Sequence, residues 1–380
     1  MDNPRIIAVE WTTLEGRRPR HAGSNARLGA HGEIVSVPLA RLVAEDGTWG
    51  FGRCRASLED ARQIVGRRLD DLFSPTAGAK GPGLAFDLPL WDLAARRENR
   101  PVYALAARSV GRPAPTAPFQ VRCYDTSLYF DDLHLADTQA AAELLAQEAR
   151  EGYARGHRAF KIKVGRGARH MPLEEGIRRD IAVVHAVRAT VGPNCPLMLD
   201  ANNGYNLNLA KRVLLETRDA DIFWLEEAFH EDVVLYRDLR EWMAAQGLSV
   251  RIADGEGQAS PSLLAWAREG VVDVVQYDIF SYGFTRWLAL ARQLDEWGVY
   301  TAPHHYGGHV GNHVSTHLAA AVERFAFVEW DEASTPGLDA SAYVVEEGQV
   351  HVPAAPGFGL ELDLERFAHA VRQGGFTATA

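Results

Sequence analysis

Cysteine is scarce in this chain of 380 residues, and its placement excludes two kinds of stabilised fold. Cys54, Cys123 and Cys195 lie far apart and form no CxxC pair. The sequence therefore indicates neither a zinc knuckle nor a disulfide framework. We interpret the three residues as free thiols in a reducing cytosol.

Long apolar runs and basic runs are also missing. No stretch reaches the roughly 18 apolar residues that a membrane-spanning helix requires. Residues 1–11 carry no basic flank followed by a long apolar run, as a secretory signal would. The formal net charge is −10, without a long run of Lys and Arg, which argues against nucleic-acid binding. We expect a cytoplasmic protein that acts on a small molecule, with no membrane or nucleic-acid partner.

The remaining composition is that of a globular protein with more than one part. Hydrophobic residues make up 47% of the chain and charged residues 24%, which allows a sizeable core. The length exceeds that of one ordinary domain. A Pro- and Ala-rich segment, GRPAPTAP at 111–118, predicts a domain boundary. We predict an N-terminal α+β domain at 1–118, a second domain at 119–340, and a C-terminal segment at 341–380.

The two ends of the chain show strand patterns. Strands are expected at 6–11, where residue types alternate, and at 34–44. Between them, residues 16–32 are rich in Gly, Arg and His and are predicted to form a loop. The tail after about residue 340 contains VVEEGQVHVP, which reads as strand and turn, and we expect this tail to pack back on the first domain.

From about residue 119, short apolar runs alternate with longer amphipathic stretches. The runs lie at 160–164, 197–201, 222–228, 250–256, 274–280, 299–305 and 325–330, and helices are expected at 173–191, 207–217 and 233–246. Strands that alternate with helices predict βαβ units and a parallel sheet. No GxGxxG turn follows a strand, so a dinucleotide-binding fold is not indicated. Seven or eight such strands favour a closed (β/α) barrel.

Almost every one of these runs ends in an ionisable residue, although buried parallel strands are normally apolar. The residues are Lys161 and Lys163, Asp200, Glu226, Asp254 and Glu256, Asp278, His304 and His305, and Glu329. The carboxyl ends of the strands of a (β/α) barrel meet at one mouth, which carries the active site. A single polar strand end is often a helix cap, but seven in succession predict an active site.

Three acids at successive strand ends, Asp200, Glu226 and Glu256, predict a metal site. Three neighbouring carboxylates raise one another's pKa unless a cation lies among them. Ligation by oxygen alone suits Mg²⁺. Two choices stay open at this point. Glu226 and Glu227 are expected to point to opposite faces, so that only one enters the mouth, and Asp254 competes with Glu256.

Acid–base groups flank these acids. Lys161 and Lys163 project on the same side of one strand, where a cationic neighbour and burial are expected to lower the pKa of one lysine into the range of a general base. From adjacent strands, Asp278 is expected to accept the N–H of His304 and raise the basicity of the ring. Glu329 is expected to hydrogen-bond a substrate carboxylate.

The ordered motifs KxK, D-A-N, E-E, G-E, Q-x-D, P-H and V-E-W resemble those of the enolase superfamily, in its mandelate racemase-like subgroup. The resemblance spans the whole chain. It implies the α/β fold class in the form of a modified (β/α)7β TIM-type barrel with an N-terminal α+β capping domain, to which the C-terminal segment returns. It also implies the cofactor Mg²⁺.

The resemblance implies a role for each motif residue. Lys163 is similar to the family's base, and Lys161 to the lysine beside the substrate carboxylate. Asp200, Glu226 and Glu256 resemble the magnesium ligands, Asn202 the site asparagine, Asp278 and His304 the His–Asp dyad, and Glu329 the acid that stabilises the enediolate.

The chain departs from the family pattern in a few places. The third ligand lies in ADGEG, which keeps both Asp254 and Glu256 as candidates, and His305 directly follows His304. The segment GFGRCR at 50–55 has Arg53 where many members have Glu.

The family reaction begins with removal of the proton next to a carboxylate. By resemblance, we predict a dehydratase of an aldonate or aldarate that forms a 2-keto-3-deoxy acid through an enediolate. The alternative is a racemase or epimerase that uses the same residues. Arg20, His21, Asn202 and His305 are predicted to bind the substrate, and a homo-oligomer is expected. Other polar residues of the loop predicted at 16–32, namely Arg17, Arg18, Asn25 and Arg27, suit a polyhydroxy or second-carboxylate end of the substrate.

Overall fold

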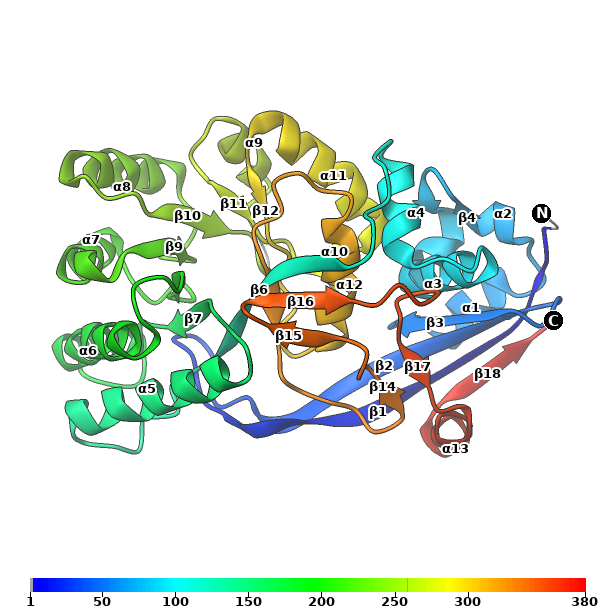
Figure 1. Ribbon diagram of the computed structural model, residues 1–380, viewed down its shortest axis with the longest axis horizontal. Coiled ribbons are helices and arrows are strands. Elements are labelled where there is room, and N and C mark those ends of the chain that lie inside the picture. Colours follow the sequence, from blue (N-terminus) through cyan, green and yellow to red (C-terminus); the bar gives the residue numbers. More distant parts are fainter. Residues whose placement is uncertain (1–2, 258) are drawn as a thin grey trace.

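A computed structural model describes residues 3–257 and 259–380. It contains an antiparallel sheet built mainly from the start of the chain and a larger parallel sheet that closes on itself (Figure 1). Within the described residues, no helix is both long enough and apolar enough to cross a membrane.

The antiparallel sheet has the strand order β18-β1-β2-β3. Its members are β1 (Ile6–Ala22), β2 (Gly32–Ala44), β3 (Trp49–Arg53) and β18 (Phe376–Thr379). Helix α3 (Asp87–Arg97) packs on β3 and β2. The approach is close at Gly50, where an added Cβ would lie 2.3 Å from the backbone nitrogen of Leu93. Glycine is therefore required there by packing.

The loop prediction for residues 16–32 is wrong in its first part. Strand β1 continues to Ala22, and Gly16 and Arg17 pair with Val35 and Ile34 of β2. The strand persists because Arg17 also exchanges backbone hydrogen bonds with Ser334 on its other side. Backbone pairing on both sides outweighs the local preference of Gly, Arg and Pro for a loop.

Eight parallel strands, β6 to β13, form the barrel. They are β6 (Phe119–Leu128), β7 (Phe160–Lys163), β8 (Leu197–Asp200), β9 (Ile222–Glu226), β10 (Arg251–Asp254), β11 (Val274–Val275), β12 (Tyr300–Thr301) and β13 (Val328–Trp330). Each neighbour pairs in parallel, β13 pairs with β6, and a bridge between Thr301 and Phe325 closes the ring. The predicted (β/α)7β barrel with an N-terminal capping domain is confirmed.

Helices connect the strands around the outside. The principal ones are α5 (Thr138–Ala154), α6 (Leu173–Val191), α7 (Leu207–Glu216), α8 (Val233–Gln246), α9 (Leu263–Arg268), α10 (Ile279–Tyr282), α11 (Phe284–Trp297) and α12 (Val310–Ala319). Inside the barrel, a separate apolar cluster includes Tyr124, Met198, Trp224 and Phe327. This packed layer leaves only the carboxyl ends of the strands for polar side chains.

The C-terminal segment serves both parts of the molecule. Strands β15 (Val344–Glu346) and β16 (Gln349–Val352) form a hairpin, and β16 pairs antiparallel with β6 of the barrel. The hairpin thus packs on the barrel, and a later part of the tail makes the expected contact with the first domain. Strand β18 makes the return to the cap, where it pairs with β1 (Figure 1).

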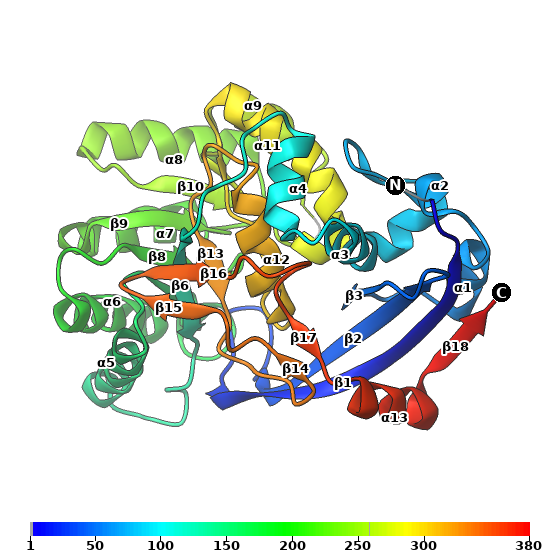
Figure 2. The same cartoon turned by 45° about the vertical axis from the view of Figure 1, so that its right-hand side comes forward.

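The β1–β2 ribbon extends from the cap along the barrel (Figure 2). Beyond its end, Ser24 forms a bridge with Phe130, just after β6. The segment between β1 and β2 is thereby held at the barrel.

Candidate active site

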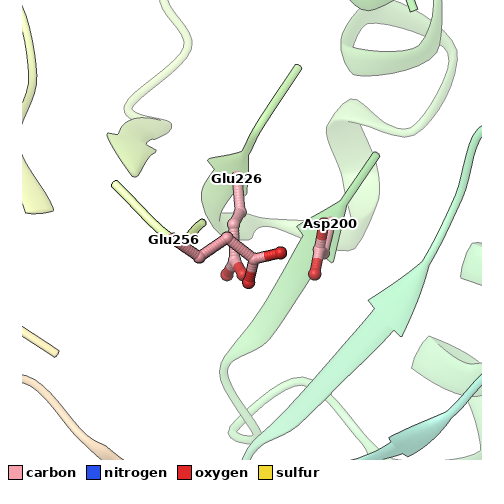
Figure 3. A group of neighbouring side chains, drawn as sticks. All are labelled: Asp200, Glu226 and Glu256. Carbon is pink, nitrogen blue, oxygen red and sulfur yellow. The ribbon is translucent and has the colours of Figure 1, made fainter. Parts of the chain in front are cut away.

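Three buried carboxylates converge at the mouth of the barrel. Asp200 and Glu226 are the last residues of β8 and β9, and Glu256 lies two residues after β10 (Figure 3). One carboxylate oxygen from each lies within 4.8 Å of the others. Burial would raise the pKa of Asp200, but Lys163 and Lys161 bring it down to about 2. Burial and the charge of Asp200 raise the pKa of Glu226 to about 8.

The donor set fits a hard cation. All three carboxylates are fully or almost fully buried, and the buried Oδ1 of Asn202 has no hydrogen-bond partner among the described residues. Asn202 donates its Nδ2 to Glu256 Oε1 and Glu227 Oε2, at 3.1 Å each. Uncompensated carboxylates at this spacing repel strongly, and an oxygen-preferring divalent ion removes that cost.

The structure settles the competition between Asp254 and Glu256. Asp254 accepts hydrogen bonds from the Tyr236 hydroxyl and from Gly255 N, whereas Glu256 joins the group of three acids. Gly255 has φ +124°, a conformation that suits glycine. The chain can therefore turn after Asp254 and present Glu256.

Glu227 does not point to the opposite face as expected. Its φ of +42° turns the chain at the end of β9, and its carboxyl lies beside the three acids, where it shares the amide of Asn202 with Glu256. Burial and the charges of Glu256 and Asp200 raise the pKa of Glu227 to about 10. The expectation that successive side chains point to opposite faces does not hold here, because the strand ends at Glu226.

Two lysines lie against these acids from β7. Lys161 Nζ is 2.7 Å from Glu226 Oε1, 3.2 Å from Glu329 Oε1 and 3.4 Å from Asp200 Oδ2. Lys163 Nζ contacts Asp200 Oδ2. Burial lowers the pKa of each lysine, but the neighbouring carboxylates outweigh it and raise both. The expected lowering of a lysine pKa is therefore wrong for this arrangement of charges.

The predicted dyad is formed on the next two strands. Asp278 and His304 share a backbone bridge, and His304 Nδ1 is 3.3 Å from Asp278 Oδ2. His304 Nε2 lies 3.3 Å from Glu256 Oε2. Burial disfavours the imidazolium, yet Glu256, Glu329 and Asp278 raise the pKa of His304 to about 10. Asp278 also caps α10 by accepting from the backbone N–H groups of Phe280 and Ser281.

The structure corrects the prediction for His305. Its ring is buried, its Nε2 lies 2.6 Å from the carbonyl oxygen of Glu329, and it packs so closely on α12 that a Cβ added at Gly311 would collide with it. The substrate-binding role predicted for His305 is therefore not supported. His304 is the histidine that faces the acids.

Glu329 serves as an acceptor for several donors. Its Oε1 accepts from Thr126 Oγ1 at 2.8 Å and lies near Lys161, and its Oε2 accepts from the backbone nitrogens of His305 and Tyr306 at 2.7 and 3.1 Å. Burial would raise the pKa of Glu329, but Lys161, His304 and His305 hold it well below its usual range. Glu329 is thus an anion that fixes Lys161 and the segment after His304.

Arg20 and His21 lie apart from this centre. Arg20 pairs with Asp131 at 3.0 Å and Glu148 at 2.8 Å and donates to the Ser127 carbonyl. The exposed side chain of His21 lies 3.8 Å from Asp131. No contact that the structure gives for either residue reaches the lysines or the dyad, so the substrate roles predicted for Arg20 and His21 are not supported.

A group of aromatic residues and Arg18 lies near Lys163. The rings of Tyr129 and Tyr306 stack at 4.7 Å, and His31 contacts both edge-on. Lys163 Nζ is 5.1 Å from the Tyr129 ring centre, and Arg18 lies 4.5 Å over Tyr306. These residues come from both parts of the molecule, and of them only Arg18 was a candidate from the sequence.

Two side chains that hold Glu226 in place were also not predicted from the sequence. Gln276 Nε2 and Trp224 Nε1 donate to Glu226 Oε2 at 2.9 and 3.0 Å. Such partners fix the orientation of a ligating carboxylate. Gln276 belongs to the Q-x-D motif, but a motif alone does not reveal which side chain it supports.

This geometry, with three convergent carboxylates between two acid–base groups in a (β/α)7β barrel, defines a class of metal-dependent acid–base enzymes. Residues 144–366 match the family of enolase C-terminal domain-like proteins. The chain belongs to the enolase superfamily, in its mandelate racemase and muconate-lactonizing subgroup.

Solved structures and curated relatives give more detail. A galacturonate dehydratase from Geobacillus sp., complexed with D-galacturonate and 5-keto-4-deoxy-D-galacturonate, is 46% identical, with a TM-score of 0.94 over 99% of both chains. A variant of a galacturonate dehydratase from Geobacillus sp., complexed with Mg, has a TM-score of 0.96 over 99% of this chain and 97% of that one. The arabinonate dehydratase of Saccharolobus solfataricus is 25% identical, over 93% of this chain and 87% of its own.

Proposed function

We propose that this protein is a Mg²⁺-dependent sugar-acid dehydratase and that D-galacturonate is a substrate. The observation that carries the proposal is the placement of three buried carboxylates between Lys163 on one side and the Asp278–His304 dyad on the other. The likeness to the galacturonate dehydratase of Geobacillus sp. supports the reaction and the substrate.

Asp200, Glu226 and Glu256 would hold the metal. When bound, Mg²⁺ polarises the substrate carboxylate, which acidifies the neighbouring C–H bond, and it offsets the negative charge that raises the pKa of Lys163. The unpartnered oxygen of Asn202 adds a polar contact at the same place.

The remaining steps belong to protein side chains. Lys163 removes the proton from the carbon next to the carboxylate, and Lys161 stabilises the enediolate as a fixed positive charge. His304, protonated and held by Asp278, gives its proton to the hydroxyl on the next carbon, which leaves as water. The resulting enol tautomerises to a ketone. Glu329 positions Lys161 and the segment after His304 instead of contacting the enediolate.

The product follows from this order of bonds. In D-galacturonate the lost proton is on C5 and the lost hydroxyl on C4, which gives 5-keto-4-deoxy-D-galacturonate. That compound is present with the Geobacillus enzyme. Numbered from the reacting carboxylate, it is the 2-keto-3-deoxy pattern expected from the sequence, formed here on a uronate. The cytoplasmic location and homo-oligomeric state stay predictions.

One experiment tests the proposal against epimerisation. The protein is incubated with Mg²⁺ and D-galacturonate, and 2-keto acid formation is followed together with exchange of the C5 proton in D₂O. We expect a keto product. Exchange without a keto product would instead indicate an epimerase, and the absence of both would refute the proposed substrate. Chelation of the metal serves as the control and should stop both signals.

A further inference from the structure

A cavity of about 610 Å³ lies between the capping domain and the barrel, directly beside the dyad. Its barrel side includes Asp278 and the segment that follows, with Arg286 of α11. Its cap side includes Arg53, the last residue of β3, and Arg55. The ring of His304 reaches Asp278 with one nitrogen and Glu256 with the other. The ring of His304 therefore lies between Asp278, which lines this cavity, and Glu256.

Arg53 is a largely buried cation that forms no ion pair with a described residue. Its guanidinium carbon lies 3.7 Å from the centre of the Phe280 ring, and its Nε is buried without a hydrogen-bond partner in the part of the chain that the structure describes. Burial and the neighbouring Arg55 lower the pKa of Arg53 to about 10, and the charge of Asp278 offsets this only in part. A buried guanidinium without a carboxylate is costly unless a ligand supplies the negative charge.

The acids at the cavity are already engaged. Asp278 holds His304 and caps α10. Asp87 accepts from the backbone N–H and the hydroxyl of Thr285. Among the described residues, no ion pair is found for Arg53, Arg55 or Arg286. The cavity is therefore lined by three guanidinium groups that form no ion pair with any described residue, although the charge of Asp278 also acts on Arg53.

We propose that this cavity binds a second carboxylate of the substrate, with Arg53 as its principal ligand, so that the protein accepts sugar diacids. The inference rests on the proposed function, in which the first carboxylate lies at the three acids. A guanidinium binds a carboxylate through paired N–H donors.

Three acids with the same arrangement of hydroxyls isolate the far end of the substrate. Galactarate carries a carboxylate there, D-galacturonate an aldehyde, and L-galactonate a primary alcohol. Binding is measured by calorimetry with Mg²⁺ in a Lys163→Met background, so that the result does not depend on turnover. Arg53→Met is then added to remove the charge and keep the contact with Phe280.

We expect galactarate to bind more tightly than L-galactonate. Arg53→Met should weaken the binding of galactarate about 10- to 100-fold, the range expected for the loss of a hydrogen bond to a charged group. The binding of L-galactonate, which has no charged group at this end, should weaken by less than about threefold in the same variant. Arg251→Met is the matched control. Its guanidinium lies 4.2 Å over Phe223 at the start of β10, so its loss should change neither affinity.

Two results would overturn the inference. The first concerns an Arg53→Met variant whose melting curve matches that of its parent. If this variant loses the same affinity for both acids, or loses none for either, the inference is refuted. The other is galactarate binding no tighter than L-galactonate binding when Arg53 is present. Turnover of the three acids by the protein with Lys163 intact is measured separately. Tight, Arg53-dependent binding of galactarate without turnover of any acid would refute the dehydratase and leave the second-carboxylate site standing.

Discussion

Replacing Asp278 with asparagine separates the charge of the dyad from its structural role. Asp278 accepts two backbone hydrogen bonds as the N-cap of α10, and Asn caps helices about as well as Asp. The fold should therefore survive. What disappears is the negative charge 3.3 Å from His304 Nδ1.

The size of the effect follows from the surroundings of His304. The Glu256 and Glu329 charges raise its pKa more than the hydrogen bond and charge of Asp278 do, so the variant keeps part of the stabilisation of the imidazolium. Loss of the charged partner in a close ion pair such as this one, at 3.3 Å, costs about 1.5–3 kcal/mol. Dehydration should therefore slow about 10- to 100-fold. Exchange of the α-proton by Lys163, on the other side of the site, should fall by less than about tenfold.

The assay compares kcat for keto-acid formation with the rate of proton exchange in D₂O. Asp232→Asn is the matched control, because Asp232 caps α8 by accepting from Val234 and Leu235 in the same way and has no histidine partner among its contacts. Unchanged dehydration in Asp278→Asn, or an equal loss of both rates, would refute the role assigned to the dyad.

Three further predictions concern the metal, the packing and pH. Asp200→Asn should lower kcat/KM by about 1,000-fold, or about 4 kcal/mol, and weaken Mg²⁺ binding measured by calorimetry. The circular dichroism spectrum should not change. Normal turnover would contradict the assignment of Asp200 as a metal ligand. Gly50→Ala should reduce the free energy of unfolding by about 1–3 kcal/mol, because the added Cβ meets the backbone of Leu93. The control Gly29→Ala, whose Cβ would have nothing within 4 Å, should change the free energy of unfolding little. Equal urea midpoints for the two variants would contradict this prediction. Burial lowers the pKa of His157, but the neighbouring Cys123, the hydrogen bond with Glu332 and the charge of Asp125 raise it to about 10. The stabilisation by His157 is therefore complete below about pH 6.5 and is lost as pH rises toward 10. Between pH 7 and 9, the free energy of unfolding in urea should therefore fall by about 2 kcal/mol more in the wild type than in His157→Gln. An equal fall in both proteins would contradict this prediction.

The sequence by itself determined the barrel and the acids of its mouth. Strand and helix periods are local, and the carboxyl ends of parallel strands must meet. Residues at the strand ends, such as Asp200, Glu226 and Lys163, could therefore be assigned to one site without coordinates. The limits of helices α6 and α8, Leu173–Val191 and Val233–Gln246, also agree with the predicted spans.

Tertiary structure alone decided what lies beyond a strand end or between domains. The turn at Glu227 depends on a positive φ, and the burial of His305 depends on packing against Gly311. The ion pairs that hold Arg20 join residues more than 100 positions apart. The same applies to Arg53, which looked like a mere departure from a motif. Its importance arises from a cavity that exists only because the cap closes on the barrel, and no local period in the sequence encodes that contact.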